Sequence, residues 1–403
     1  MKKFLLKIYF FFNGGSKGKT ILQFLLCIGM LVAAICLAVN DVVSNMFGAA
    51  LGFIFSTLVL RLIKLITISF EDSLKINFDT DSLLKRYYND SDYRKTLTIN
   101  GTSTDFAYAE YHIEAEGNLA DVMEVEDDPE KMMQLDEFLC EKFERIFAAH
   151  KGSDKPNSLT VRLDGVKKED GKYVLQLSRS TVYNHLVTNR AIDFEFFDDT
   201  TLRDVYEFGP ELSSFEESKM SNHVGINGLV FLSDGRLLVP HRNNQSTMSK
   251  NKVTASIAVK LNPPKHKAKV TKQYFFEQTI IDSLTSRARI PADILNKEHI
   301  EIEFLGFGQS VYEGGKPQFY FAVKLHDINT AKYHEVYEKS VKQKSLDEDK
   351  CIYVADFSSF RFTKNKKLSF EHIDHNGKRI KKTLGCEMSY LVNLWHYMRN
   401  LEK

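Results

Sequence analysis

Two long apolar runs near the N-terminus constrain this chain more than any other feature. Residues 21–39, ILQFLLCIGMLVAAICLAV, carry no charged side chain, and residues 42–60 form a second apolar run directly after Asn40 and Asp41. A helix of about 20 apolar residues spans the roughly 30 Å of hydrocarbon in a bilayer. Both runs are longer than the apolar core of a secretory signal peptide. The sequence therefore predicts two antiparallel transmembrane helices.

Basic residues flank the two runs on their outer sides. Five lysines precede the first run within residues 1–20, and Arg61 and Lys64 follow the second, whereas the turn between the runs holds no basic residue. Cytoplasmic segments next to transmembrane helices carry an excess of lysine and arginine. The pattern predicts a basic arm at 1–20, a transmembrane hairpin at 21–68, and both chain ends in the cytoplasm.

Small residues recur at every fourth position of the second run, at Gly48, Gly52 and Ser56. Such a stripe lets two helix backbones approach closely inside a bilayer. The partner is either the first helix of the same chain or the hairpin of another protomer, and the sequence leaves both open. The second alternative predicts a homo-oligomer.

The remaining chain has the composition of an ordinary globular protein. The formal net charge of the 403 residues is +1 and charged residues make up 27%, so the totals give no general preference for nucleic acid or acidic partners. The five cysteines form no CxxC pair, which favours free thiols in a reducing compartment. The acidic stretch 110–130 lacks the spacing of a calcium loop and is predicted to be a solvated face. We therefore expect no metal and no cofactor.

Beyond residue 68 the hydrophobic spacing changes between helical and strand periods, which predicts an α+β fold. Within 69–220 we expect a linker helix at 72–88, a helix from Pro129 to just before Gly152, and a hairpin of 159–163 with 173–177. Within 221–403 we expect a hairpin of 226–232 with 236–240, a strand at 253–261, a helix at 270–287, a hairpin of 300–311 with 318–325, and a closing helix at 386–401.

The order of these last elements, with the sequence GINGLVFLSDGRLLVPHR at residues 225–242, resembles the opening of a Nudix domain. The resemblance implies a cytoplasmic mixed-sheet α/β/α domain over 221–403, with 69–220 as an N-terminal extension. In active Nudix hydrolases a helix supplies several glutamates that hold magnesium beside a diphosphate. The corresponding stretch here, 269–291, offers only Glu277 and Asp282, which are five residues apart and not on one helix face. We predict no catalytic residues, and a membrane-tethered nucleotide hydrolase that uses Glu277 remains the alternative.

A nucleotide ligand needs cationic or amide donors for its phosphates and planar groups for its bases. The loop at 241–252 and the start of the predicted helix at 270–287 offer both kinds of group, although a solvated loop and a buried helix face are the alternative interpretations. Arg179, Tyr183 and Arg190 are further candidates for a basic and aromatic wall. The predicted ligand-binding residues are Arg242, Asn243, Asn244, Lys250, Lys252, Gln273, Tyr274 and Glu277.

The combination of a two-helix hairpin and a Nudix-like domain without its carboxylates is similar to one class of effector in bacterial antiphage systems that signal with cyclic oligonucleotides. The resemblance implies that the cytoplasmic domain senses a cyclic nucleotide, made by a cognate nucleotidyltransferase, and that the hairpins assemble to disrupt the lipid bilayer of the inner membrane. A membrane scaffold that binds a protein partner is a further alternative.

Overall fold

The computed structural model describes residues 76–87, 90–111, 122–148, 157–196, 200–242, 251–264, 274–343 and 350–402, together with Ser56 and His150. The chain divides into two compact units, of which residues 74–148 and 155–403 form the larger. In the smaller unit only Ser56 and His150 are described. The fold below is that of the larger unit.

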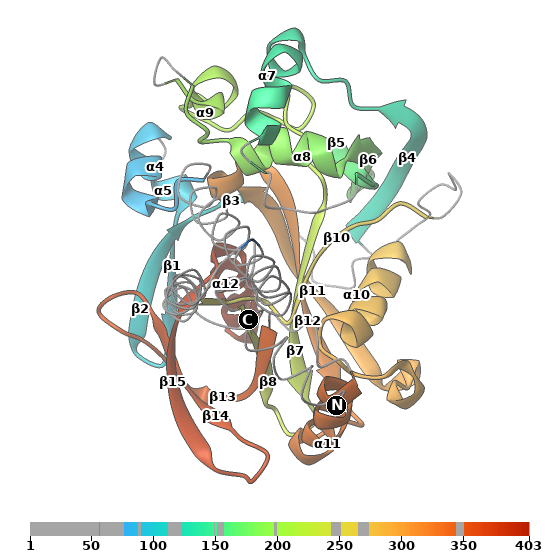
Figure 1. Ribbon diagram of the computed structural model, residues 1–403, viewed down its shortest axis with the longest axis vertical. Helices are drawn as coiled ribbons and strands as arrows, with labels where there is room; N and C mark the ends of the chain where they lie inside the picture. Colours follow the sequence, from blue (N-terminus) through green and yellow to red (C-terminus); the bar gives the residue numbers. More distant parts are fainter. Residues whose placement is uncertain are drawn as a thin grey trace, which may run out of the picture. The chain divides into compact units, whose positions relative to one another are not determined.

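One large sheet of ten strands organises this unit (Figure 1). Its strand order is β13-β14-β15-β9-β8-β7-β12-β11-β3, and β10 pairs with the first half of β7, on the edge that β8 pairs with further along the strand. Its strands are β3 (Ala109–Tyr111), β7 (Gly225–Leu232), β8 (Leu237–Arg242), β9 (Lys252–Val253), β10 (Ile257–Lys260), β11 (Ile300–Ser310), β12 (Lys316–Leu325), β13 (Lys350–Phe362), β14 (Leu368–Ile373) and β15 (Arg379–Cys386).

Two smaller sheets and a set of short helices surround the large sheet. The two-stranded sheet pairs β1 (Arg94–Ile99) with β2 (Thr102–Ala107), and the three-stranded sheet has the order β4 (Met123–Met132), β6 (Lys172–Thr181), β5 (Leu159–Glu169). The α-helices are α4 (Thr80–Arg86), α5 (Asp90–Tyr93), α7 (Glu137–Ala148), α8 (Val182–Val187), α9 (Leu202–Tyr206), α10 (Tyr274–Ser286), α11 (Thr330–Gln343) and α12 (Met388–Leu401). The 3-10 helices are η1 (Asn189–Ala191), η3 (Ala292–Ile294), η4 (Lys297–His299) and η5 (Val311–Glu313).

The central strands β7 and β12 are buried on both faces. They run parallel, from Gln318 opposite Gly225 to Leu325 opposite Leu232. Alternate residues of a strand point to opposite sides of the sheet, so Ile226 and Val230 enter one core and Leu229 enters the other. A strand covered on both faces reads as a continuous apolar run, which explains the sequence GINGLVFL of β7.

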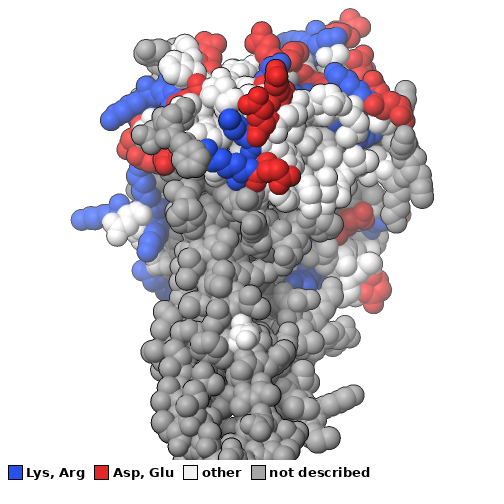
Figure 2. All heavy atoms as spheres, turned by 45° about the horizontal axis from the view of Figure 1, so that its top comes forward, with Lys and Arg blue, Asp and Glu red and all other residues white. Residues whose placement is uncertain are grey.

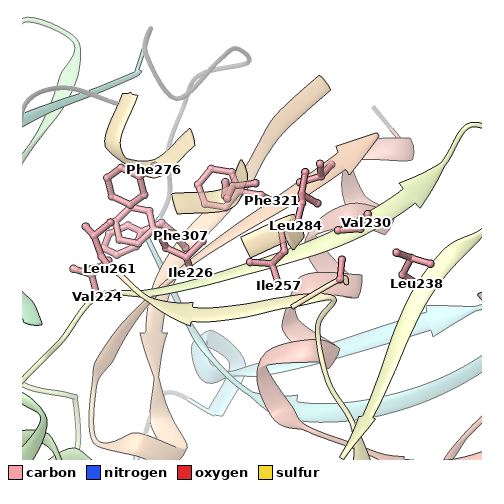
Figure 3. Packing of buried hydrophobic residues seen from close by; sticks show 14 of the residues in the cluster. Val224, Ile226, Val230, Leu238, Ile257, Leu261, Phe276, Leu284, Phe307 and Phe321 are labelled. Carbon is pink, nitrogen blue, oxygen red and sulfur yellow. The ribbon is translucent and has the colours of Figure 1, made fainter. Parts of the chain in front are cut away.

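Helices cover both faces of the central sheet. On one face α10 buries Phe276, Ile280 and Leu284 against β7, β10 and β12, as the close view in Figure 3 shows for Phe276 and Leu284. On the other face α12 buries apolar side chains that include Leu391 and Leu394. Each helix therefore presents one apolar stripe to the sheet.

Five strands of the large sheet close into a ring. β13 pairs with β14 on one side and with β8 on the other, while β14–β15, β15–β9 and β9–β8 complete the circuit. Closure leaves these strands no free edge within the ring. Its interior is continuous with the core under α12, to which Val239, Phe370 and Cys386 belong.

A close approach joins α12 to the extension that precedes β3. His396 is 3% exposed, and a hydrogen bond of 3.1 Å joins its Nε2 to the hydroxyl of Tyr108. Burial, helped by the charges of Arg399 and Lys95, lowers the pKa of His396 to about 3, so the imidazole is neutral. Gly306 of β11 packs against the imidazole of His396, since a Cβ at Gly306 would lie 2.2 Å from His396 Cε1. Only glycine fits at this position.

A third core, formed by residues that include Tyr87, Val187, Ile192 and Val311, lies around a buried arginine. Arg203 is 1% exposed and donates through Nε and one terminal nitrogen to Asp193, at 2.6 and 2.9 Å. Its other terminal nitrogen donates to the hydroxyl of Tyr87 at 3.1 Å. The ion pair and these hydrogen bonds satisfy a charge that burial would otherwise strongly disfavour.

Glu207 in the same core makes stability depend on pH. The carboxylate is 2% exposed, and burial raises its pKa from 4.5 to about 7. The folded state therefore holds this proton up to about pH 7 while the unfolded state releases it near pH 4.5, so stability falls as pH rises through this window. Glu207 is expected to lower the free energy of unfolding by about 3 kcal/mol as the pH rises through this window. Replacing Glu207 by glutamine is expected to remove this decrease. Urea denaturation at pH 5 and pH 8 measures it, and an equal pH dependence in both proteins would contradict the prediction.

The predicted fold class and location are corrected by this structure. Among the described residues no helix has both the length and the apolar composition needed to cross a bilayer. The longest of these helices, α11 and α12, have 14 residues each, against the about 20 that hydrocarbon requires. The described residues therefore give no support to the predicted two-helix hairpin or to the two-pass location in the inner membrane. The predicted mixed-sheet α/β/α domain is replaced by a fold of three sheets, in the largest of which five strands close into a ring. The runs 21–39 and 42–60 lie outside the described residues except for Ser56, which is helical and exposed.

Several local predictions are confirmed. The hairpins of β5 with β6, β7 with β8, and β11 with β12, and the helices α10 and α12, lie where they were expected. The start of one helix is wrong, because Pro129 lies within β4 and α7 begins at Glu137. Asp136 supplies the cap there, since its carboxylate accepts from the amide of Leu139 at 3.0 Å. The linker helix predicted at 72–88 is shorter in the structure. Among the described residues of that range, only α4 is helical.

Candidate anion-binding site at the end of strand β8

Two of the predicted ligand-binding residues lie side by side at the base of the connection between β8 and β9. Arg242 ends β8 and Lys252 begins β9, and their neighbours His241 and Val253 are directly opposite each other in the antiparallel ladder. The ladder fixes both cationic side chains at the same end of the sheet. Loops anchored in this way by rigid strands are common binding positions.

Among the described residues, two arginines and one carboxylate act on the charge of Arg242. Burial lowers the pKa of its guanidinium, and the charges of Arg287 and Arg190 lower it further, while Glu387 acts in the opposite direction. Arg190 is 5% exposed in η1, and Arg287 directly follows α10. Arginines that are partly removed from water and repel one another are stabilised by a bound anion.

An aromatic platform holds the second cation. The Lys252 ammonium lies 4.4 Å from the centroid of the Phe78 ring, within the range of a cation–π contact. Phe78 is 39% exposed and stacks on Tyr312 at 6.2 Å. Tyr312 is fixed in turn by hydrogen bonds of its hydroxyl to the hydroxyl of Thr80 at 2.9 Å and from the amide of Ala107 at 3.0 Å. The platform is therefore rigid and partly open to solvent.

A buried polar network lies next to Arg190. The amide nitrogen of Asn189 donates to the carbonyl of Glu313 at 2.8 Å, and Lys316 pairs with the Glu313 carboxylate at 3.3 Å. Gln318 donates to the same carboxylate at 3.3 Å and accepts from Asn227 at 2.8 Å. Polar side chains linked in this way restrict one another's conformations.

Within its described residues, the structure places none of the other predicted ligand-binding residues at this site. Asn243, Asn244, Lys250 and Gln273 lie outside the described residues. Tyr274 is the first residue of α10, and its side chain is outside the described part. Glu277 is exposed one turn further along, and Asp282 accepts a hydrogen bond from Gln278 at 2.6 Å. The stripe residues Gly48 and Gly52 also lie outside the described residues.

The basic and aromatic wall proposed from the sequence is divided by the fold. The charge of Arg190 acts on Arg242, whereas Arg179 is buried in a two-pronged ion pair with Asp127, at 2.6 and 2.8 Å. Tyr183 packs on Phe147 with ring centroids 4.5 Å apart. Only the arginine in η1 therefore belongs to the site.

Three contributors to the site were missed by the sequence analysis: Phe78, Arg287 and Glu387. Phe78 is far from Lys252 along the chain, and no local pattern connects the two. Arg287 opens the RAR run at 287–289, at the end of the predicted helix at 270–287, and this cluster of basic residues at a helix end was an available signal.

Charge of both signs is mixed over one face of the molecule (Figure 2). Figure 2 shows basic and acidic side chains interspersed on the face that comes forward from the top of Figure 1, with no continuous area of either sign among the described residues in view. No group of three or more histidine, cysteine, aspartate or glutamate side chains within the described residues is arranged to hold a metal ion.

No protein-family model and no curated protein match this chain. The geometry alone therefore carries the functional argument.

Proposed function

We propose that this chain binds a phosphate-bearing nucleotide at the end of β8, with a cyclic nucleotide as the first candidate. The observation that carries the proposal is the environment of Arg242, whose partly buried guanidinium experiences two further arginine charges against one carboxylate. A phosphate placed there forms charge-assisted hydrogen bonds and relieves the repulsion between the arginines.

The aromatic platform supports a nucleotide over a simple phosphate. Phe78 offers a partly exposed aromatic ring, and its cation partner Lys252 lies beside Arg242 in the ladder of β8 and β9. Bases stack on aromatic rings, and each such contact contributes about 1–3 kcal/mol. In an antiviral pathway this binding is the sensing step, and a nucleotidyltransferase supplies the ligand.

Calorimetric titration of the full chain with cyclic dinucleotides, and with the matching nucleosides, tests the proposal. The cyclic dinucleotides are expected to bind at least about tenfold more tightly than the nucleosides, because charge-assisted contacts contribute about 1.5–3 kcal/mol. The affinity is expected to fall as the salt concentration rises. Equal binding of nucleosides and nucleotides, or no binding of any nucleotide, would overturn the proposal. Light scattering on the same samples tests homo-oligomerisation on ligand binding.

A further inference from the structure

The ring formed by β8, β13, β14, β15 and β9 has an apolar interior and one polar end. Along β15, Ile380, Lys382, Leu384 and Cys386 alternate with more exposed residues, so this set points into the ring. Directly opposite residues lie on the same face of a ladder. The inward positions on the other strands therefore follow from the pairs Tyr353–Val239, Cys351–His241, Ala355–His372 and Phe370–Lys382.

Polar side chains gather where β8 and β14 end and β13 and β15 begin. The Tyr353 ring lies at the centre of this group, 6.1 Å from His241 and 5.0 Å from His372 between ring centroids. The Lys382 ammonium lies 5.2 Å from the centroid of the same ring. Cys351, opposite His241, completes the polar end.

Among the described residues, Lys382 is the cationic side chain that faces the Tyr353 ring. Within the described residues Lys382 makes no ion pair, and its ammonium contacts the Tyr353 ring. Asp374 is the carboxylate whose charge acts on His372, but it accepts hydrogen bonds from the amides of Asn376 and Lys378, at 2.9 and 2.8 Å. These bonds hold it in the turn that follows β14.

The two histidines are held in the neutral form near pH 7. Burial lowers the pKa of His241 and of His372, and the charge of Lys382 lowers both further. His372 Nδ1 lies 3.3 Å from the carbonyl of Val354, so a neutral ring that donates there keeps Nε2 as an acceptor. The charged and titratable groups that face the two imidazoles are Lys382, Tyr353, Cys351, His334 and Asp374.

We propose that this polar end of the ring binds a small oxyanion, a tetrahedral or carboxylate group, through Lys382, His372 and His241, and takes up a proton on binding. The anion attracts the ammonium and stabilises the imidazolium form of a neighbouring histidine. Proton uptake follows because the unoccupied site holds neutral imidazoles at neutral pH. Binding therefore tightens as the pH falls.

This site is separate from the one at Arg242. His241 and Arg242 are consecutive residues of β8, so their side chains point to opposite faces of the strand. The inference does not rest on the proposed nucleotide site, and arginines at that site take up no proton near neutral pH. Proton uptake therefore distinguishes the two sites.

Calorimetric titration of the full chain with sulfate and with acetate tests the proposal, since neither ion changes its own charge between pH 6 and pH 8. At pH 7 the titration is repeated in two buffers of different ionisation enthalpy, with the wild-type protein and with Arg242→Gln. One or both ions are expected to bind with net proton uptake in both proteins, and at least about threefold more tightly at pH 6 than at pH 8. The two ions distinguish a tetrahedral ligand from a carboxylate.

Matched variants locate the binding. Lys382→Gln is expected to weaken it at least about tenfold and Lys382→Arg to retain it, because an anion's hydrogen bonds to a charged donor contribute about 1.5–3 kcal/mol. His372→Gln is expected to reduce the proton uptake. Lys381→Gln, at an exposed outward position of the same strand, is expected to change neither. Binding without proton uptake, binding unchanged by Lys382→Gln, binding lost in Arg242→Gln, or no binding of either ion would overturn the proposal.

Discussion

Replacing Asp193 by alanine is expected to lower the free energy of unfolding by about 3–5 kcal/mol, because it leaves a buried guanidinium without its counter-charge. Arg203 is 1% exposed, and both oxygens of Asp193 accept from it. Asp193 also accepts from the backbone amide of Asn77 at 2.7 Å. The substitution therefore removes the partner of the arginine and one tie to the segment that precedes α4.

Urea denaturation measures this loss, and an exposed ion pair of the same protein provides the control. Lys324 pairs with Glu301 at 2.7 Å, with side chains that are 38% and 47% exposed. Exposed pairs contribute about 0–1 kcal/mol, so Lys324→Gln is expected to have a small effect. If Asp193→Ala lowered stability by no more than Lys324→Gln, the assignment of Arg203 as a charge that depends on its partner would be wrong.

Replacing Gly306 by alanine is expected to lower the free energy of unfolding by about 3 kcal/mol, at the upper end of the range for overpacked cores. The added Cβ would lie 2.2 Å from His396 Cε1 and 2.4 Å from its Nδ1. His396 cannot move aside freely, because it is 3% exposed and hydrogen-bonded to Tyr108. The alanine therefore separates β11 from α12 or breaks the hydrogen bond.

A double-mutant cycle identifies the cause. Gly306→Ala combined with His396→Ala is expected to be less destabilising than the sum of the single changes, because the smaller side chain makes room for the methyl group. Gly385→Ala is the matched control, since a Cβ there meets Lys252 Cγ at an ordinary 3.6 Å. Additive single effects, or equal losses for the two alanines, would contradict a steric origin.

Sequence patterns predicted the parts of the fold that depend on interactions between residues close together in the chain. The hairpin of β7 and β8 follows from two apolar runs around Ser233, Asp234 and Gly235, and Gly235 adopts the φ of +75° that such a turn requires. The closing helix follows from the apolar stripe of α12. Both signals are contained within about twenty residues of sequence, so tertiary contacts did not override them.

Long-range pairing could not be predicted in this way. The ring closes because residues 350–355 pair with 237–242, more than a hundred positions earlier in the chain. The alternation of β15 indicates one buried face but not which strand lies opposite. The apolar runs at 21–39 and 42–60 dominated the predicted fold class, although the described part of the chain is organised by its sheets.

The candidate site was predictable only where it depends on chain neighbours. Arg242 and Lys252 flank one connection, so a strand on each side was enough to bring them together. Three charged residues reach the same place from other elements. They are Arg190 from η1, Arg287 from directly after α10, and Glu387 from directly before α12. No spacing in the sequence relates these three elements, so their convergence emerges only from the tertiary fold.

The most direct test of the nucleotide site is a titration of the full chain with a cyclic dinucleotide that compares wild type, Arg242→Gln and Arg379→Gln. Arg379 is an exposed arginine of β15 that pairs with Glu371 at 3.0 Å, so the same substitution there provides the matched control. The expected result is a loss of affinity of about tenfold to a hundredfold for Arg242→Gln and no change for Arg379→Gln. Equal affinity of all three proteins would contradict the site at the end of β8.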